Sequence, residues 1–123
     1  MKILIIEDEE ILARTMSEKL VREGFDVLVA LDGLQGLQMA LSEHPDIILL
    51  DIILPKLDGL SMLRKLREDS WGSHVKVIIL SNLSDSRGMT KGVDIGLNDV
   101  SLYLVKTDWS LDDMVVKIKE RLV

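Results

Sequence analysis

The sequence of 123 residues contains no cysteine and only two histidines. Disulfides, thiolate metal sites and cysteine nucleophiles are therefore excluded, and two histidines do not supply a convincing zinc site. The lack of cysteine also fits a reducing compartment. Only Met1, one lysine and four Ile or Leu residues precede the first acidic cluster, and this stretch is too short for a signal peptide or a membrane span. We therefore expect a cytoplasmic protein.

Aromatic residues are scarce at 3 %, whereas hydrophobic residues reach 47 %, so the core must be built from Leu, Ile, Val and Met. The formal net charge is −6 and no run of lysine and arginine occurs, which argues against nucleic acid or an anionic membrane as a direct partner. Basic protein surfaces stay open as partners. The length suits one domain over residues 1–123, with no linker, repeat or low-complexity segment.

Long apolar runs are also missing, and four short runs instead end in polar residues. Runs that are apolar throughout, rather than alternating, are typical of parallel strands buried on both faces. Because open α/β sheets bind ligands at the carboxyl ends of their strands, these polar residues are expected to converge there. A further strand is predicted over 26–30. The runs are 3–6, 47–50, 77–80 and 102–105, followed by Glu7 with Asp8, Asp51, Ser81 and Lys106.

Helix signals separate the predicted strands, so that five strand–helix units predict a doubly wound α/β sheet. The first helix covers about residues 9–23 and ends before Gly24, and the second begins after Asp32 and ends at His44-Pro45. The third follows the loop 54–59 and breaks near Trp71-Gly72, and the last begins after Ser110. The residues on their apolar faces are Leu12, Met16 and Leu20; Leu37, Ala40 and Leu41; Leu60, Leu63 and Leu66; and Leu111, Met114, Val115, Ile118 and Leu122.

The fourth helix, expected between Ser84 and Val100, is weakened by glycines at every fourth position, namely Gly88, Gly92 and Gly96. Each glycine inside a helix costs about 0.5–1 kcal/mol relative to alanine, so this helix is expected to be marginal. Close packing against a neighbouring element and a segment that rearranges explain the glycines equally well.

Each polar strand end also has a plain structural explanation. Glu7 and Asp8 could be solvated loop residues, Asp51 could cap the next helix, Ser81 suits a turn, and Lys106 suits an exposed surface. Their coincidence at four strand ends instead favours a site for a hard cation and a phosphoryl group. Magnesium prefers oxygen ligands, for which two carboxylates and a backbone carbonyl suffice.

Asp8 and Asp51 are the candidate direct ligands of such a magnesium ion. A carboxylate in this position can act as a nucleophile toward phosphorus. Lys106 would then neutralise phosphoryl oxygens together with the cation, and the Ser81 hydroxyl would donate a hydrogen bond to one of them.

With these pieces in this order, the sequence resembles the receiver domain of two-component response regulators over essentially its whole length. The matching segments are 5–9, 51–55 with Asp58-Gly59, 79–81 and 103–106. The resemblance implies a flavodoxin-like α/β fold: a five-stranded parallel sheet of order 2-1-3-4-5, doubly wound, with helices on both faces. It implies a sensor histidine kinase, a phosphotransfer protein or a small phosphodonor as the phosphoryl source.

The resemblance also implies a role for each site residue. Asp51 is the expected phosphoacceptor, and the metal ligands are expected to be Glu7 and Asp8 as the acidic pair, Asp51 itself and the Ile53 carbonyl. The expected catalytic and switching residues are the phosphate-binding Lys106, the switch hydroxyl of Ser81 and the aromatic Tyr103, which changes rotamer with it. The domain would catalyse its own phosphorylation and dephosphorylation at most, and would act on a downstream output protein or domain. A phosphorylation-dependent homodimer stays open.

Thr107 and Asn82 depart from the family pattern, and Ile53 and Leu83 add a finer prediction. The usual Lys-Pro with its cis peptide is Lys106-Thr107 here, and a cis bond before a non-proline residue costs roughly 2.5–4 kcal/mol, so trans is expected. Asn82 replaces a small residue after the switch hydroxyl and could crowd phosphoryl entry or add a hydrogen bond. Ile53 and Leu83 are bulky and apolar, which predicts slow self-dephosphorylation by excluding water.

Two other functions compete with a phosphorylation-dependent switch. A receiver-like interaction module that works without phosphorylation is compatible with Asn82, Thr107 and the irregular fourth helix. An aspartate-nucleophile phosphatase for small molecules is disfavoured, because Ile52 and Ile53 follow Asp51 where a general acid would be needed.

Overall fold

The computed structural model describes residues 1–81, 102–105 and 110–122. The sheet is parallel and has the order β2-β1-β3-β4-β5, which confirms the predicted fold class. Lys106, Thr107, Asn82, Leu83 and the glycine-spaced segment 84–100 lie outside the described residues. The elements are β1 (Lys2–Ile6), α1 (Glu10–Arg22), β2 (Asp26–Ala30), α2 (Gly33–Glu43), β3 (Ile47–Asp51), α3 (Gly59–Glu68), β4 (Lys76–Ser81), β5 (Leu102–Val105) and α5 (Leu111–Leu122).

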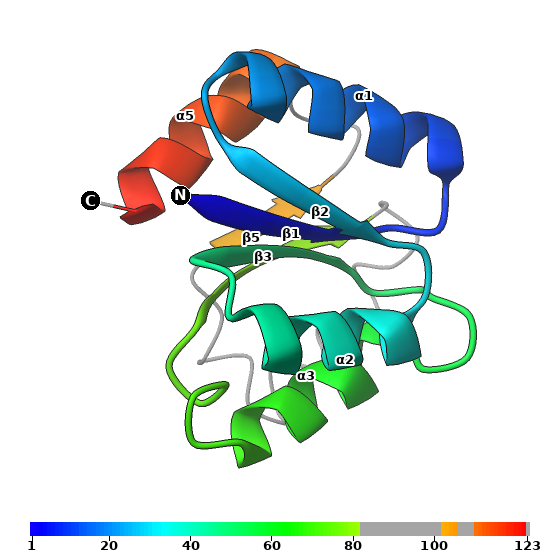
Figure 1. Cartoon of the computed structure of the whole chain (residues 1–123). Helices are drawn as coiled ribbons and strands as arrows, with labels where there is room; N and C mark the ends of the chain where they lie inside the picture. Colours follow the sequence, from blue (N-terminus) through cyan, green and yellow to red (C-terminus); the bar gives the residue numbers. More distant parts are fainter. Residues whose placement is uncertain (82–101, 106–109, 123) are drawn as a thin grey trace.

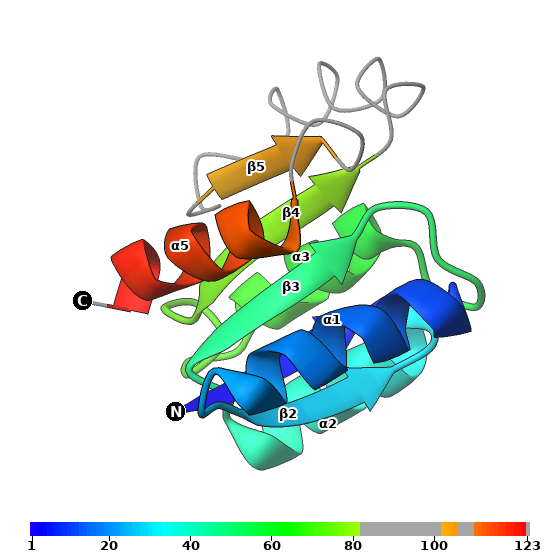
Figure 2. The ribbon, with the colours of Figure 1, turned by 90° about the horizontal axis from the view of Figure 1, so that it is seen from above.

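The molecule has three layers, with α1 and α5 on one face of the sheet and α2 and α3 on the other (Figures 1 and 2). Successive strand residues enter opposite cores: Ile3 and Ile5 pack with α1 and α5, whereas Leu4 and Ile6 belong to the core under α2 and α3. All four are completely buried. Two helix-covered faces explain why the strand sequences are apolar throughout rather than alternating.

Most predicted helix boundaries are confirmed by their capping contacts. The Asp32 carboxylate accepts a hydrogen bond from the Gln35 N–H at 2.7 Å, and the Ser110 hydroxyl accepts one from the Asp113 N–H at 3.1 Å. His44 ends α2 in the left-handed region with φ 47°, and Gly24 follows α1 with φ 96°.

One prediction about the helix faces was wrong, and one helix ends slightly earlier than predicted. Leu41 does not face the core, since 37 % of it is exposed. The helix after the loop 54–59 ends at Glu68, before Trp71-Gly72, because the Asp69 carboxylate accepts the Gly72 N–H at 2.8 Å and closes a turn. The cap of that helix is Asp58, so the plain structural explanation of Asp51 as the cap of the next helix does not hold.

Two ion pairs hold α1 beside α5. Lys19 Nζ lies 2.9 Å from Asp112 Oδ1, and Lys119 Nζ lies 3.1 Å from Glu23 Oε1. The hydrogen bond with Asp112 raises the pKa of Lys19 and lowers that of Asp112, and the one with Lys119 lowers the pKa of Glu23. Because these pairs lie at the surface, each adds little to the stability of the fold.

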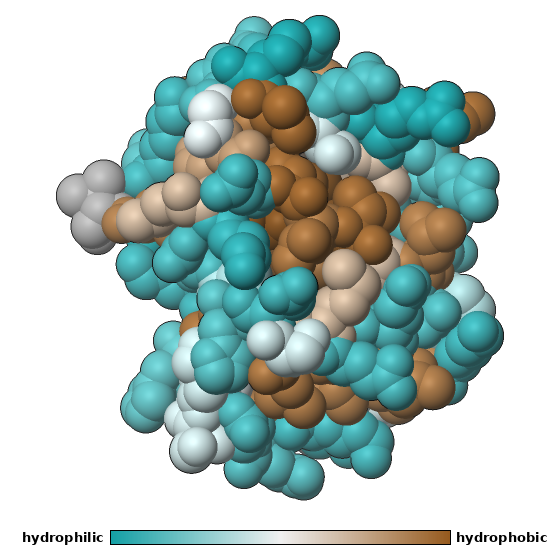
Figure 3. Space-filling view, viewed as in Figure 1, coloured by the Kyte–Doolittle hydropathy of each residue, from teal (hydrophilic) through white to brown (hydrophobic). Residues whose placement is uncertain are grey.

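Among the residues that the structure describes, strand β2 forms one edge of the sheet and pairs only with β1. Figure 3 shows apolar side chains gathered in the middle of the face seen in Figure 1, where β2 runs between α1 and α2. Its Val27, Leu28 and Val29 are each half-buried.

Within the part of the chain that the structure describes, no helix has the length and apolarity to cross a membrane.

Candidate functional site

The site lies at the carboxyl ends of β1 and β3, the two central neighbours of the sheet. Ile6 pairs with Leu50 in the parallel register, so Glu7 and Asp51 are the next residues along each strand. Glu7, Asp8 and Asp51 each offer a carboxylate oxygen, and these oxygens all lie within 4.8 Å of one another. The structure thus brings together the three carboxylates that the strand-end pattern singled out.

The three carboxylates differ in burial. Glu7 is completely buried and Asp51 is only 4 % exposed, whereas Asp8 is exposed. Glu7 is fixed by its backbone, since its N–H donates to the Ala30 carbonyl of β2 at 3.0 Å. Its carboxylate accepts the Glu9 N–H at 3.3 Å, at the start of α1. Two buried carboxylates therefore form the floor of the site, and Asp8 stands at its mouth.

The segment after Asp51 returns to the site through a tight contact. The Gly59 N–H donates to the Ile52 carbonyl at 2.7 Å, and a Cβ at Gly59 would overlap the Asp51 carbonyl oxygen. Only glycine permits this approach of α3 to the end of β3. The side chain of Ile53 is 62 % exposed, so it stands at the rim rather than in the core.

Asp58, which was predicted only as part of the loop, caps α3. Its carboxylate accepts the Ser61 N–H and the Ser61 hydroxyl, each at 2.9 Å. Partial burial raises the pKa of Asp58, but the hydrogen bonds from Ser61 and from its own backbone N–H, together with the charge of Arg64, lower the pKa more, so it lies below its usual value. The signal was present in the sequence, because Asp followed by Gly opened an apolar helical pattern.

The other predicted residues can be placed by backbone only. Asp51 pairs with Leu80, and Ser81 pairs with Val105. The backbone of Ser81 therefore lies at the carboxyl end of the sheet, as the three carboxylates do. Tyr103 pairs with Ile79 inside β5. Lys106 follows the last residue of β5 and lies outside the described residues.

The donor set fits magnesium. Three carboxylates with oxygens this close repel one another when ionised, and a divalent cation is the species that offsets this repulsion. Every donor is an oxygen, and the mouth at Asp8 is exposed, so the ion could keep several of its waters. Among the described residues, this is the only group of three or more His, Cys, Asp or Glu with such spacing.

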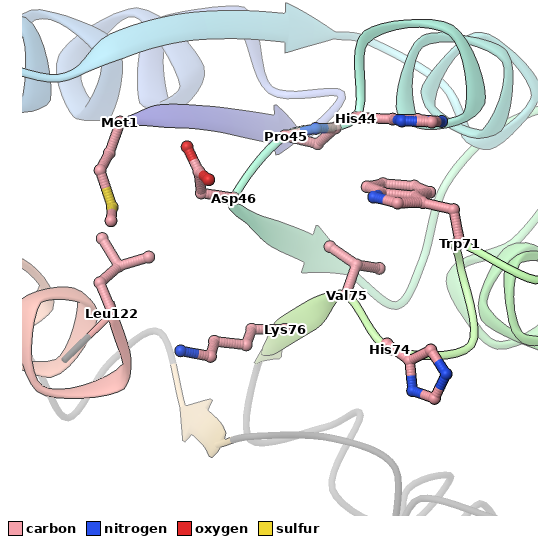
Figure 4. Close-up of a pocket in the computed structure, with 9 residues that line it drawn as sticks. All are labelled: Met1, His44, Pro45, Asp46, Trp71, His74, Val75, Lys76 and Leu122. Atoms are coloured by element: carbon pink, nitrogen blue, oxygen red, sulfur yellow. The ribbon is translucent and has the colours of Figure 1, made fainter.

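A hollow lies at the amino end of the sheet, where the strands begin, opposite the three carboxylates (Figure 4). It has a volume of about 380 Å³, and none of the predicted site residues lines it. His44 and Trp71 stack there, with ring centroids 4.2 Å apart and planes 8° from parallel. The lining residues are Met1, His44, Pro45, Asp46, Trp71, His74, Val75, Lys76 and Leu122.

Comparison with known proteins agrees with this geometry. Residues 3–119 match the family described as the response regulator receiver domain. The response regulator ArlR of Staphylococcus saprophyticus is 37 % identical over 121 residues, which are 98 % of this chain and 52 % of that protein. The DNA-binding dual master transcriptional regulator RpaA of Synechocystis is 33 % identical, over 96 % of this chain and 47 % of its own. The chain thus spans about half the length of these relatives.

Solved receiver structures share the fold. A Francisella response regulator receiver domain superposes with a TM-score of 0.84 at 29 % identity, covering 98 % of this chain and 95 % of that one. The receiver domain of a sensor histidine kinase from Pseudomonas aeruginosa superposes with a TM-score of 0.87 at 26 % identity, covering 98 % and 96 %. That second structure has a magnesium ion coordinated in its active site cleft.

Proposed function

The chain belongs to the response regulator receiver family, and on this premise we propose that it accepts a phosphoryl group on Asp51 in a reaction that requires Mg²⁺. The single observation that carries the proposal is the meeting of Glu7, Asp8 and Asp51 within 4.8 Å at the ends of two neighbouring strands. Receiver domains bind Mg²⁺ in such an acidic pocket.

The proposed ligands of the ion are the Asp8 and Asp51 carboxylates and the Ile53 carbonyl, with Glu7 as the supporting acid. The ion would supply neutralisation of the phosphoryl oxygens. An Asp51 carboxylate oxygen attacks phosphorus, the bond from phosphorus to the donor breaks, and the donor leaves with that electron pair. The near-complete burial of Asp51 limits the access of water to the acyl phosphate that forms.

Ser81, Tyr103 and Lys106 complete the proposal through the family pattern. Ser81 stands at the end of β4 beside Val105, and Lys106 is the next residue after Val105. We propose that Lys106 and the Ser81 hydroxyl bind the phosphoryl oxygens and that Tyr103 follows Ser81, which alters the surface around the fourth helix and β5. We further propose slow self-dephosphorylation, because Ile53 and Leu83 are bulky and apolar.

The partners are proposed at two levels. Response regulators receive their phosphoryl group from histidine kinases and act through output domains, so a kinase or phosphotransfer protein is the proposed donor. One relative is a DNA-binding regulator about twice as long as this chain, so a direct nucleic acid partner is not excluded for a protein containing this domain. We propose that residues 1–123 form one receiver domain that works in the cytoplasm, with a phosphorylation-dependent homodimer still open.

The test is phosphorylation in solution. Wild type incubated with acetyl phosphate and Mg²⁺ is expected to gain one phosphoryl group by mass spectrometry, and Asp51→Asn is expected to gain none. Asp46→Asn, at the other end of the sheet, is the matched control and is expected to react like wild type. No gain in wild type would sink the proposal.

The alternative function, an interaction module independent of phosphorylation, is separated by its partner. If an output partner binds Asp51→Ala as tightly as phosphorylated wild type, that alternative holds. For the dephosphorylation proposal, polar residues at Ile53 and Leu83 together are expected to speed phosphate loss, and an unchanged rate would count against it.

A further inference from the structure

The loop that follows Asp51 is held by the first turn of α2. The Gly33 N–H donates to the Pro55 carbonyl at 3.3 Å, and Lys56 Nζ lies 3.6 Å from Asp32 Oδ2. Gly33 is buried, and a Cβ there would overlap the carbonyl oxygen of Leu57. Two consecutive residues of one turn thus contact three consecutive residues of the loop.

The two carboxylate oxygens of Asp32 contact two different segments, helix α2 and the loop that follows Asp51. Oδ1 accepts the Gln35 N–H at 2.7 Å and caps α2, while Oδ2 faces Lys56. Lys56 has φ 66°, a left-handed conformation that a lysine rarely adopts without support from its surroundings. Lys56 is largely exposed whereas Asp32 is mostly buried, so the ion pair is the weaker restraint and the close backbone contact at Gly33 is the stronger one.

These contacts bracket the proposed carbonyl ligand. At one end the Ile52 carbonyl accepts the Gly59 N–H at 2.7 Å, and at the other end Pro55 is held by Gly33. Only Ile53 and Leu54 lie between these anchors, and Leu54 is itself buried in the core under α2 and α3. The backbone of Ile53 therefore has little freedom to move away from Asp51.

We propose that the Asp32-Gly33 turn positions the metal-binding loop, so that α2 sets the affinity of the site for Mg²⁺ without contacting the ion. Gly33 and Asp32 are positioning residues, because they act through Pro55, Lys56 and Leu57. This inference rests on the proposed function, because it requires the Ile53 carbonyl to be a ligand of Mg²⁺. Supporting contacts around metal ligands typically change metal affinity by about 10–100-fold when lost.

The test compares two glycines of the same helix. Gly33→Ala pushes the loop away at Leu57, whereas Gly36→Ala meets only the Ile6 side chain in the core, at 2.6 Å. Gly33→Ala is expected to weaken Mg²⁺ binding by about tenfold in calorimetric titration. Its phosphorylation by acetyl phosphate is expected to recover at saturating Mg²⁺. The Mg²⁺ affinity is measured under conditions in which the variant is fully folded without the ion, because Mg²⁺ would also rescue a variant that is merely destabilised. Gly36→Ala is expected to lower stability yet bind Mg²⁺ within about twofold of wild type.

A second pair of variants covers the case in which Gly33→Ala does not fold. Asp32→Asn keeps a good helix cap but loses the charge that faces Lys56, and Lys56→Gln removes the partner. Each is expected to weaken Mg²⁺ binding at least about twofold. Wild-type affinity in the folded variants would overturn the positioning role and leave the proposed function intact. Absence of Mg²⁺ binding by wild type would overturn both.

Discussion

The two ends of the sheet use polar residues in opposite ways. At the carboxyl end, Glu7 and Asp51 are buried carboxylates only a few ångströms apart, an arrangement that disfavours the folded state when no cation is bound. At the amino end, Arg67 donates to the Gly72 and Val75 carbonyls at 2.7 and 2.8 Å, and His44 stacks on Trp71. One end gathers three carboxylates, and the other joins separate segments of the chain through the Arg67 hydrogen bonds and the stack of His44 on Trp71. Substitutions at the two ends are therefore expected to separate activity from stability.

The largest expected effect is that of Asp51→Asn at the carboxyl end. Phosphorylation is lost completely, because the amide is not a nucleophile for phosphorus. Without Mg²⁺ the variant is expected to be more stable than wild type by about 0.5–2 kcal/mol, since one of three clustered carboxylates is gone. Mass spectrometry and urea unfolding give the two measurements. A variant that is inactive and also clearly less stable would contradict the comparison.

The next effect is expected at the amino end, with Arg67→Met. The Gly72 and Val75 carbonyls lose their donor, so the free energy of unfolding is expected to fall by about 1–3 kcal/mol. The phosphorylation rate of the folded variant is expected to match wild type, because the site is at the opposite end. Arg64→Met, on the exposed side of the same helix, is the control and is expected to change stability by less than about 0.5 kcal/mol.

A smaller effect at the amino end is expected from two substitutions of His44. His44→Ala loses the stack on Trp71 but keeps the left-handed backbone, which is expected to cost about 0.5–1.5 kcal/mol of stability. His44→Gly loses the same stack and relieves the backbone strain, so it is expected to stay near wild type. Equal unfolding midpoints in urea for the two variants would show that φ at this position does not matter.

The smallest expected effect concerns Asp58, a carboxylate at the carboxyl end of the sheet that is expected to stabilise the fold. The pKa of Asp58 lies below its usual value of 3.8, so its stabilising contribution is fully present above that pH. It is lost as the pH falls below 3.8 through the depressed pKa. Asp58→Asn keeps a helix cap that does not titrate, and its stability at neutral pH is expected to lie within about 1 kcal/mol of wild type. The gap between the two proteins is expected to shrink, or to change sign in favour of Asn, as the pH falls below 3.8.

The sheet and the grouping of its acidic ends could be predicted from the sequence, because both follow from local pattern. Runs such as Ile47–Leu50 are apolar at every position, and the structure buries them on both faces. Parallel pairing then places Glu7 beside Asp51 without further information.

Contacts between distant segments could not be predicted in this way. Leu41 was expected in the core, but α2 approaches β1 through its small residues Gly36 and Ala40, which leaves Leu41 on the outer side. The contact of Gly33 with Leu57 and the stack of His44 on Trp71 join residues far apart in the chain, and neither leaves a periodic signal. Tyr103 and Ser81 are placed by register only, and the predictions for Asn82, Lys106 and Thr107 stay predictions.

The start of β1 and the end of α5 lie close together, since Met1 and Leu122 line the same hollow at the amino end (Figures 2 and 4). A short peptide could therefore join the two ends into a ring, and the ring could be reopened at an exposed loop. The same proximity suits insertion of the whole unit into a surface loop of another protein. In either form the junction would lie at the opposite end of the sheet from the three carboxylates. A circular permutant, or a protein into which this domain is inserted, would therefore leave the carboxylates accessible to a phosphodonor.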